Sequence, residues 1–197
     1  MSKAEKTKEF IIQRSAPIFN IKGYAGTSLN DLIIATGLTK GSIYGNFENK
    51  DEVAIAVYKY NVELMGQRIS EFLRTKKTLT EKLIGIGEYY RVNWQQVFER
   101  GGCPIQNASI EADDNLSFMK KHVQLSITNW ASSVGRIIEK GKEVGEFKKS
   151  INSEEYAYTI LSILEGGMMM GKIMNSQKLL FSALDRINTI IINEIKK

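Results

Sequence analysis

A chain of 197 residues with 43% hydrophobic and 25% charged side chains has the composition of a folded globular protein, not of a disordered one. Its formal net charge of +5 permits a polyanionic partner without requiring one. The longest stretch without charges, residues 122–135, is too short and too polar to span a bilayer. The first residues also lack the apolar segment of a signal peptide. We therefore expect a cytoplasmic protein that makes no contact with a membrane.

The supply of reactive side chains is small. The single cysteine, Cys103, can form neither an internal disulfide nor a metal site alone, and the single histidine, His122, leaves catalytic triads incomplete. We expect no catalytic residues, no metal and no cofactor, and hence a protein that is not an enzyme. The alternative is a thiol-dependent enzyme, which Cys103→Ser would inactivate. Redox sensing by Cys103 would need an exposed thiol with a low pKa.

With only two prolines and few alternating segments, the chain is expected to be all-α, with about nine helices. The spacing of the apolar residues predicts separate helices over residues 3–21, 29–36, 40–47, 50–74, 81–98, 104–114, 116–145, 153–174 and 178–195. Ser28 and Asp31 predict a capping box for the second helix. Thr39 can cap the third, and Leu38 and Ile43 have the spacing of a hydrophobic staple there.

The second and third helices form a possible helix-turn-helix, because both are short and a tight turn at Gly37 joins them. In such a unit the second helix enters the major groove of DNA. Here Ile43 and Phe47 face inward. The residues that can face outward and contact bases or phosphates are Lys40, Gly41, Ser42 and Asn46. The same spacing also fits an ordinary helical hairpin, and spacing alone does not separate the two interpretations.

A longer string of residues surrounds this unit. It reads Phe19-x3-Gly23-Tyr24-x2-Thr27-Ser28-Leu29-x-Asp31-Leu32, then Thr36-Gly37-Leu38-Thr39-Lys40-Gly41-Ser42-Ile43-Tyr44-x2-Phe47-x2-Lys50-Asp51. Across residues 8–58 the chain strongly resembles the N-terminal DNA-binding domain of the tetracycline-repressor (TetR) family of bacterial transcription regulators. The resemblance implies a homodimer with a DNA-binding domain at residues 1–50 and a helical effector-binding and dimerisation domain at 51–197. Its partners would be double-stranded operator DNA, palindromic in sequence, and a small-molecule effector.

The resemblance also assigns roles to single residues. Thr27 and Ser28 match the phosphate-contacting start of the second helix, and Tyr44 and Lys50 match two further phosphate contacts. The base-facing start of the recognition helix corresponds to Thr39, Lys40, Gly41 and Ser42. The chain departs from the family at Gly45, where an aromatic or basic residue is frequent, and at Asn46, which replaces a frequent histidine. Operator sequence and affinity are therefore the features that transfer least.

For the C-terminal part, residue roles are expected from two groups. Four aromatic residues either line an effector pocket or belong to the core: Tyr90, Trp94, Phe98 and Trp130. A second group either forms the dimer interface, which the resemblance favours, or packs within the core: Gly167, Gly171, Leu180, Leu184, Ile187 and Ile191. The predicted function is a ligand-responsive repressor, released from its operator by a small, largely hydrophobic effector. A DNA-binding adaptor without a small ligand, or under the control of a protein, is the remaining alternative.

Overall fold

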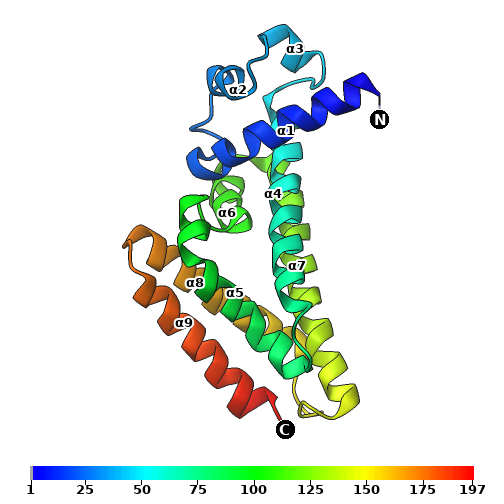
Figure 1. The fold of residues 1–197 in the computed structure, drawn as a ribbon, viewed down its shortest axis with the longest axis vertical. Coiled ribbons are helices and arrows are strands. Elements are labelled where there is room, and N and C mark those ends of the chain that lie inside the picture. Colours follow the sequence, from blue (N-terminus) through cyan, green and yellow to red (C-terminus); the bar gives the residue numbers. More distant parts are fainter. Residues whose placement is uncertain (1) are drawn as a thin grey trace. The chain divides into compact units, whose positions relative to one another are not determined.

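The computed structural model describes residues 2–197, and within them the chain is all-α, as predicted (Figure 1). Nine α-helices and a final π-helical turn follow one another in the described part of the chain. Their bounds are α1 Lys3–Lys22, α2 Leu29–Thr36, α3 Lys40–Tyr44, α4 Lys50–Leu73, α5 Leu79–Glu99, α6 Pro104–Asp114, α7 Ser117–Val144, α8 Ser153–Ile173, α9 Gln177–Ile190 and η1 Ile191–Ile195. An isolated antiparallel bridge joins Phe147 to Lys196. Within residues 2–197, no helix is both long and apolar enough to cross a membrane.

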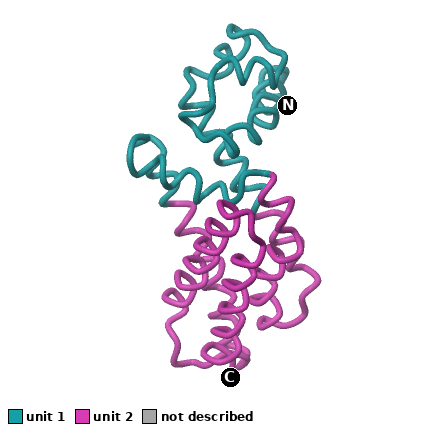
Figure 2. The backbone as a smooth tube through the Cα atoms, turned by 90° about the vertical axis from the view of Figure 1, so that its left-hand side faces the viewer, with its two compact units in different colours: residues 1–65, 100–124 teal, residues 66–99, 125–197 magenta. Residues whose placement is uncertain are grey.

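The chain divides into two compact units (Figure 2). Unit 1 comprises residues 1–65 and 100–124, and unit 2 comprises residues 66–99 and 125–197. The chain passes from one unit to the other at three points: inside α4, at the end of α5 and inside α7. The predicted boundary at residue 50 separates two functions, whereas these units are defined by contacts between residues. That boundary therefore stays a prediction.

Unit 1 is built on a small apolar core beneath α2 and α3. Its centre consists of side chains that are completely or almost completely buried: Ile11, Phe19, Leu32, Ile43, Phe47, Val53 and Val57. They come from α1 to α4 and from the residues that follow α3. Burying each such side chain contributes about 1.5–3 kcal/mol, so the short helices α2 and α3 are held mainly by this core.

The helix ends in unit 1 follow the predicted caps. Ser28 Oγ accepts a hydrogen bond from the Asp31 amide at 3.2 Å, and the Asp31 carboxylate accepts one from the Ser28 amide at 2.7 Å. These bonds complete the predicted capping box of α2. Gly37 then takes a left-handed conformation, with φ at +68°, which glycine adopts without strain.

Helix α3 is shorter than predicted, because it ends at Tyr44 and not at Phe47. Two residues explain the early end. Gly45 is a poor helix former, and the Asn46 side chain donates from Nδ2 to the Ser42 carbonyl at 2.9 Å, replacing a helical backbone bond.

In unit 2, α8 packs against α9 through glycines. A Cβ atom at Gly167 would lie 2.4 Å from Ala183 Cβ, and one at Gly171 would lie 3.2 Å from Leu180 Cβ. The two bare positions therefore let α9 of the same chain approach closely.

The same packing involves the residues predicted to form the dimer interface. All six of them are buried within the chain: Gly167, Gly171, Leu180, Leu184, Ile187 and Ile191. They form the contact between α8, α9 and their neighbours within one chain, and a contact of these helices with a second copy stays a prediction.

Candidate nucleic-acid interface and adjoining cavity

The first turn of α3 is presented to solvent by a buried base. Ile43 is 0% exposed and Phe47 is 2% exposed, and the half-buried Leu38 packs against the same core. Thr39 caps the helix, since its Oγ1 accepts a hydrogen bond from the Ser42 amide at 3.2 Å. The hydrophobic staple and the cap therefore fix the direction in which this five-residue helix points.

The residues predicted to contact bases lie on the open side of that helix. Thr39, Lys40 and Gly41 are exposed, whereas Ser42 is half-buried. Asn46, predicted as a further contact, uses one N–H of its Nδ2 on the Ser42 carbonyl, which leaves its oxygen and its second N–H for an outside partner. The structure thus brings these five residues together on one small surface.

The predicted phosphate contacts are placed less evenly. Ser28 is exposed at the start of α2, whereas Thr27 is completely buried and its hydroxyl donates to the Gly23 carbonyl at 2.6 Å. Tyr44 is half-buried against the apolar core. Ser28 therefore stands where an anion can reach a helix N-terminus, and a phosphate contact by Thr27 stays a prediction.

Lys50 is directed to the turn between α1 and α2. Its Nζ donates to the Tyr24 carbonyl at 2.7 Å and lies 4.1 Å from the centre of the Tyr24 ring. Burial lowers the pKa of this ammonium, against the opposing effect of nearby carboxylates such as Asp51 and Glu111. Lys50 thus supports the turn that precedes α2, and its predicted phosphate contact stays a prediction.

Tyr24 is the centre of a hydrogen-bond network in the same turn. Its hydroxyl donates to Asp51, and burial together with this bond raises the Tyr24 pKa to about 12. On the other side, the Glu111 carboxylate of α6 accepts from the Tyr24 amide at 2.9 and 3.1 Å and from the Ala25 amide at 3.3 Å. Residues of α4 and α6 therefore hold the backbone that leads into α2.

The end of α1 is tied to the start of α6 by a second set of hydrogen bonds, which we call the α1–α6 contact. Asn107 Nδ2 donates to the Asn20 carbonyl at 3.0 Å and to the Gly101 carbonyl at 2.9 Å, and Asn20 Nδ2 donates to the Arg100 carbonyl at 2.5 Å. Gly101, with φ at +96°, makes room for the end of α1, since a Cβ at this position would lie 2.5 Å from the Asn20 carbonyl oxygen.

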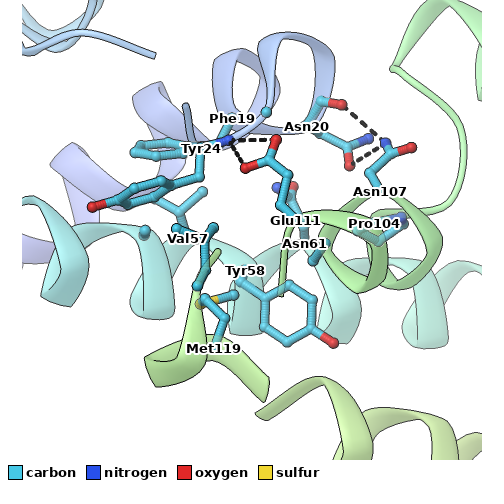
Figure 3. Close-up of a pocket in the computed structure, with 14 residues that line it drawn as sticks. Phe19, Asn20, Tyr24, Val57, Tyr58, Asn61, Pro104, Asn107, Glu111 and Met119 are labelled. Atoms are coloured by element: carbon cyan, nitrogen blue, oxygen red, sulfur yellow. Dashed lines mark hydrogen bonds between the residues drawn. The ribbon is translucent and has the colours of Figure 1, made fainter. Parts of the chain in front are cut away.

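A cavity lies beside these contacts and is enclosed by α1, α4, α6 and the start of α7 (Figure 3). Its volume is about 50 Å³, which is space for a few water molecules, and it is partly open to solvent, so a larger ligand would extend out of it. Its walls are formed by Phe19, Asn20, Gly23, Tyr24, Ala54, Val57, Tyr58, Asn61, Pro104, Asn107, Ala108, Glu111, Leu116 and Met119. All of them belong to unit 1.

This cavity is not the pocket that the sequence predicted. None of the four aromatic residues assigned to an effector pocket contributes to its walls. Tyr90 is almost completely buried next to Tyr89, and Trp94 packs edge-on against Phe98 at 5.6 Å between ring centres. Trp130 is half-buried on α7. An effector role for these four residues elsewhere in unit 2 stays a prediction.

Cys103 precedes α6 and is 2% exposed. Its carbonyl accepts the Asn107 amide at 3.0 Å, so its backbone begins the helix. A redox sensor or a thiol enzyme would need an exposed reactive thiol, whereas the Cys103 thiol is buried in this structure.

Comparison with known proteins gives matches along most of the chain. Residues 11–57 match the family model described as bacterial regulatory proteins of the tetR family, and residues 80–187 match the model of a tetracyclin repressor-like C-terminal domain. A TetR-family transcriptional regulator from Cytophaga hutchinsonii is 35% identical, with a TM-score of 0.95 over 100% of this chain and 98% of that one.

Two further similar proteins are also described as transcription regulators. A TetR transcriptional regulator from Chloroflexus aurantiacus is 30% identical, with a TM-score of 0.90 over 100% of this chain and 99% of that one. The HTH-type transcriptional repressor DhaR of Mycobacterium sp. strain GP1 is 20% identical over 93% of this chain and 89% of its own length.

Proposed function

The chain belongs to the tetracycline-repressor family of bacterial regulatory proteins, and we propose that it represses transcription from a palindromic operator until a small effector releases it. Family membership makes it a DNA-binding transcription regulator. The repressing action and the control by an effector belong to the proposal.

The observation that carries the proposal is the exposed first turn of α3. Thr39, Lys40 and Gly41 stand free of the core, while Ile43 beneath them is completely buried. A first turn held in this way is the part of a recognition helix that meets base edges in the major groove. Ser28, exposed at the N-terminus of α2, is suited to a phosphate beside that groove.

The operator is palindromic in this proposal because regulators of the family usually act as dimers. A second copy has an exposed apolar strip of α8 to meet, formed by Tyr158, Met169 and Ile173. These residues lie on α8 away from the buried Gly167 and Gly171. A two-fold dimer would place two recognition helices about 34–36 Å apart, one helical turn of DNA.

The test is selection of bound sequences from random DNA, followed by titrations with variants in a salt series. We expect two half-sites related by two-fold symmetry. Lys40→Ala should relax the preference at one or two base pairs by about 1–3 kcal/mol each. Lys50→Ala should weaken binding to all sequences and lower the salt slope by about one.

Lys149→Ala is the matched control, since this exposed lysine lies outside unit 1 and should leave DNA binding unchanged. Selection of no sequence at all would refute the proposal. Selected sites without two-fold symmetry would refute the dimer, and a changed base preference in Lys50→Ala but not in Lys40→Ala would reverse the two roles.

A further inference from the structure

The cavity of unit 1 has the chemistry of a site for an organic cation. Three aromatic rings contribute to its walls, from Phe19, Tyr24 and Tyr58, together with apolar groups such as Val57 and Met119. Glu111 is the single charged residue among the wall residues. Aromatic faces and one carboxylate attract a cation with an apolar body, and they disfavour an anion.

Glu111 keeps capacity for a further donor. Two backbone amides, those of Tyr24 and Ala25, use part of the roughly four lone-pair positions of a carboxylate. Among the described residues, no cation forms an ion pair with Glu111. Lys50 lies near enough to interact with it electrostatically, but its ammonium is bound to the Tyr24 carbonyl and does not line the cavity.

The carboxylate reaches its place because residue 23 has no side chain. A Cβ at Gly23 would lie 2.0 Å from Glu111 Oε1, and the φ of +73° also favours glycine there. Glu111 is therefore seated against the end of α1, at the inner wall of the cavity, and not on the outer surface of α6 (Figure 3).

We propose that this cavity binds a small organic cation, an ammonium or amidinium on an apolar or aromatic body, with Glu111 as its counter-ion. The inference rests on the proposed function, since it names the chemical class of the effector and the residue that reports its binding. The site lies in unit 1, at the base of the DNA-facing helices, and it does not include the aromatic residues of α5.

Binding there has a direct consequence for the DNA-facing part. A cation that binds the remaining positions of Glu111 draws the carboxylate charge toward itself and weakens the bonds that the oxygens accept from the Tyr24 and Ala25 amides. These amides belong to the turn whose carbonyls accept Lys50 and Thr27. Loosening the turn frees the start of α2 and lowers DNA affinity by the difference in ligand affinity between the two states.

The probes are benzylammonium and 2-phenylethylammonium, each with its matched alcohol, benzyl alcohol or 2-phenylethanol, and with phenylacetate as the anion. Binding to the full-length protein is followed through the amide resonances of Tyr24 and Ala25, and through hydrogen exchange of the same amides. We expect at least one of the two ammonium ions to bind about tenfold more tightly than its alcohol, and phenylacetate to bind least. We also expect exchange at both amides to become faster.

Glu111→Gln keeps an acceptor for the turn but removes the charge, so it should reduce the preference for ammonium over alcohol to about threefold or less. Asp113→Asn is the matched control, because Asp113 is an exposed carboxylate of the same helix outside the cavity wall. This control should keep the full preference. Circular dichroism of both variants verifies that they fold.

The inference is overturned if both ammonium ions bind no better than their alcohols, or if Glu111→Gln keeps the preference. It is also overturned if neither ammonium ion binds at about 10 mM, since a site of this chemistry should hold one of them weakly. DNA binding of the ligand-free protein is measured separately. If the protein selects no DNA, the proposed function fails and the ligand result stands; if it selects DNA and the ammonium ions do not bind, this inference fails alone.

Discussion

In unit 1 the end of α1 is held to α6 by amide and carboxylate hydrogen bonds, whereas in unit 2 helices α8 and α9 are held together by apolar groups that meet across glycines. The two contacts respond differently to their surroundings. Water replaces a broken hydrogen bond, so each bond of the α1–α6 contact contributes only about 0.5–1.5 kcal/mol. The α8–α9 contact opens only when packed hydrocarbon is exposed. A ligand can therefore open the first more easily than the second.

The largest effect should come from filling the closest approach of α8 and α9. Gly167→Ala places a Cβ 2.4 Å from that of Ala183, and we expect a loss of stability of about 3 kcal/mol, the upper end of overpacking. Urea unfolding followed by tryptophan fluorescence measures the stability of unit 2, because Trp94 and Trp130 both lie in that unit.

Gly66→Ala is the control for that variant, because a Cβ at Gly66 would meet nothing within 4 Å. It should be neutral or stabilise the protein by up to about 1 kcal/mol through helix propensity. Equal losses in the two variants would show that the glycines of α8 are not needed for its packing on α9.

A smaller effect should follow from shortening one side chain of the α1–α6 contact. Asn107→Ala removes the donor that binds the Asn20 and Gly101 carbonyls, and we expect the contact to lose about 1–2 kcal/mol. Hydrogen exchange at the end of α1 should become about five- to thirtyfold faster, while the tryptophan-detected transition of unit 2 changes less.

Asn115→Ala offers a comparison at the other end of α6, where the exposed side chain makes no hydrogen bond among the described residues. Its effect should stay within about 0.5 kcal/mol. If Asn107→Ala behaves in the same way, the α1–α6 contact owes its stability to apolar packing and the proposed difference between the two contacts is wrong.

The smallest effect is a change of stability with pH, and it begins only well above neutrality. Burial and the bond to Asp51 raise the Tyr24 pKa to about 12, so the folded protein favours the neutral phenol. The stabilisation is complete below the ordinary tyrosine pKa of about 10 and is lost as the pH rises from there to about 12. On α8, burial and a hydrogen bond to Glu194 of η1 also raise the pKa of Tyr156.

Absorbance titration measures this pKa as the difference between the wild type and Tyr24→Phe. Of the eight tyrosines in the chain, the one missing from the variant should ionise late. A difference curve centred near pH 10 would contradict the prediction.

The sequence predicted the caps and the buried residues of α2 and α3 well because their signals are local. Ser28 and Asp31 are three residues apart, and Leu38 and Ile43 are five residues apart, so each pattern contains both partners of its contact. The early end of α3 was missed because the Asn46 side chain replaces a backbone bond, which helical periodicity does not reveal.

The cavity and the α8–α9 contact could not be predicted in the same way. Tyr24 and Glu111 are 87 positions apart, and no spacing connects them. The glycines at 167 and 171 do indicate that some helix approaches α8 closely. They do not identify that helix, which in the structure is α9 of the same chain.

The buried position of Cys103 has a practical consequence for following motion in solution. The thiol is 2% exposed, it precedes α6 next to the α1–α6 contact, and the chain has no second cysteine. Alkylation by a maleimide therefore requires α6 to separate transiently from its neighbours, and the labelling rate counts those events. The rate at which Cys103 is labelled in the unchanged sequence therefore reports how often unit 1 opens, and no cysteine has to be introduced for the measurement.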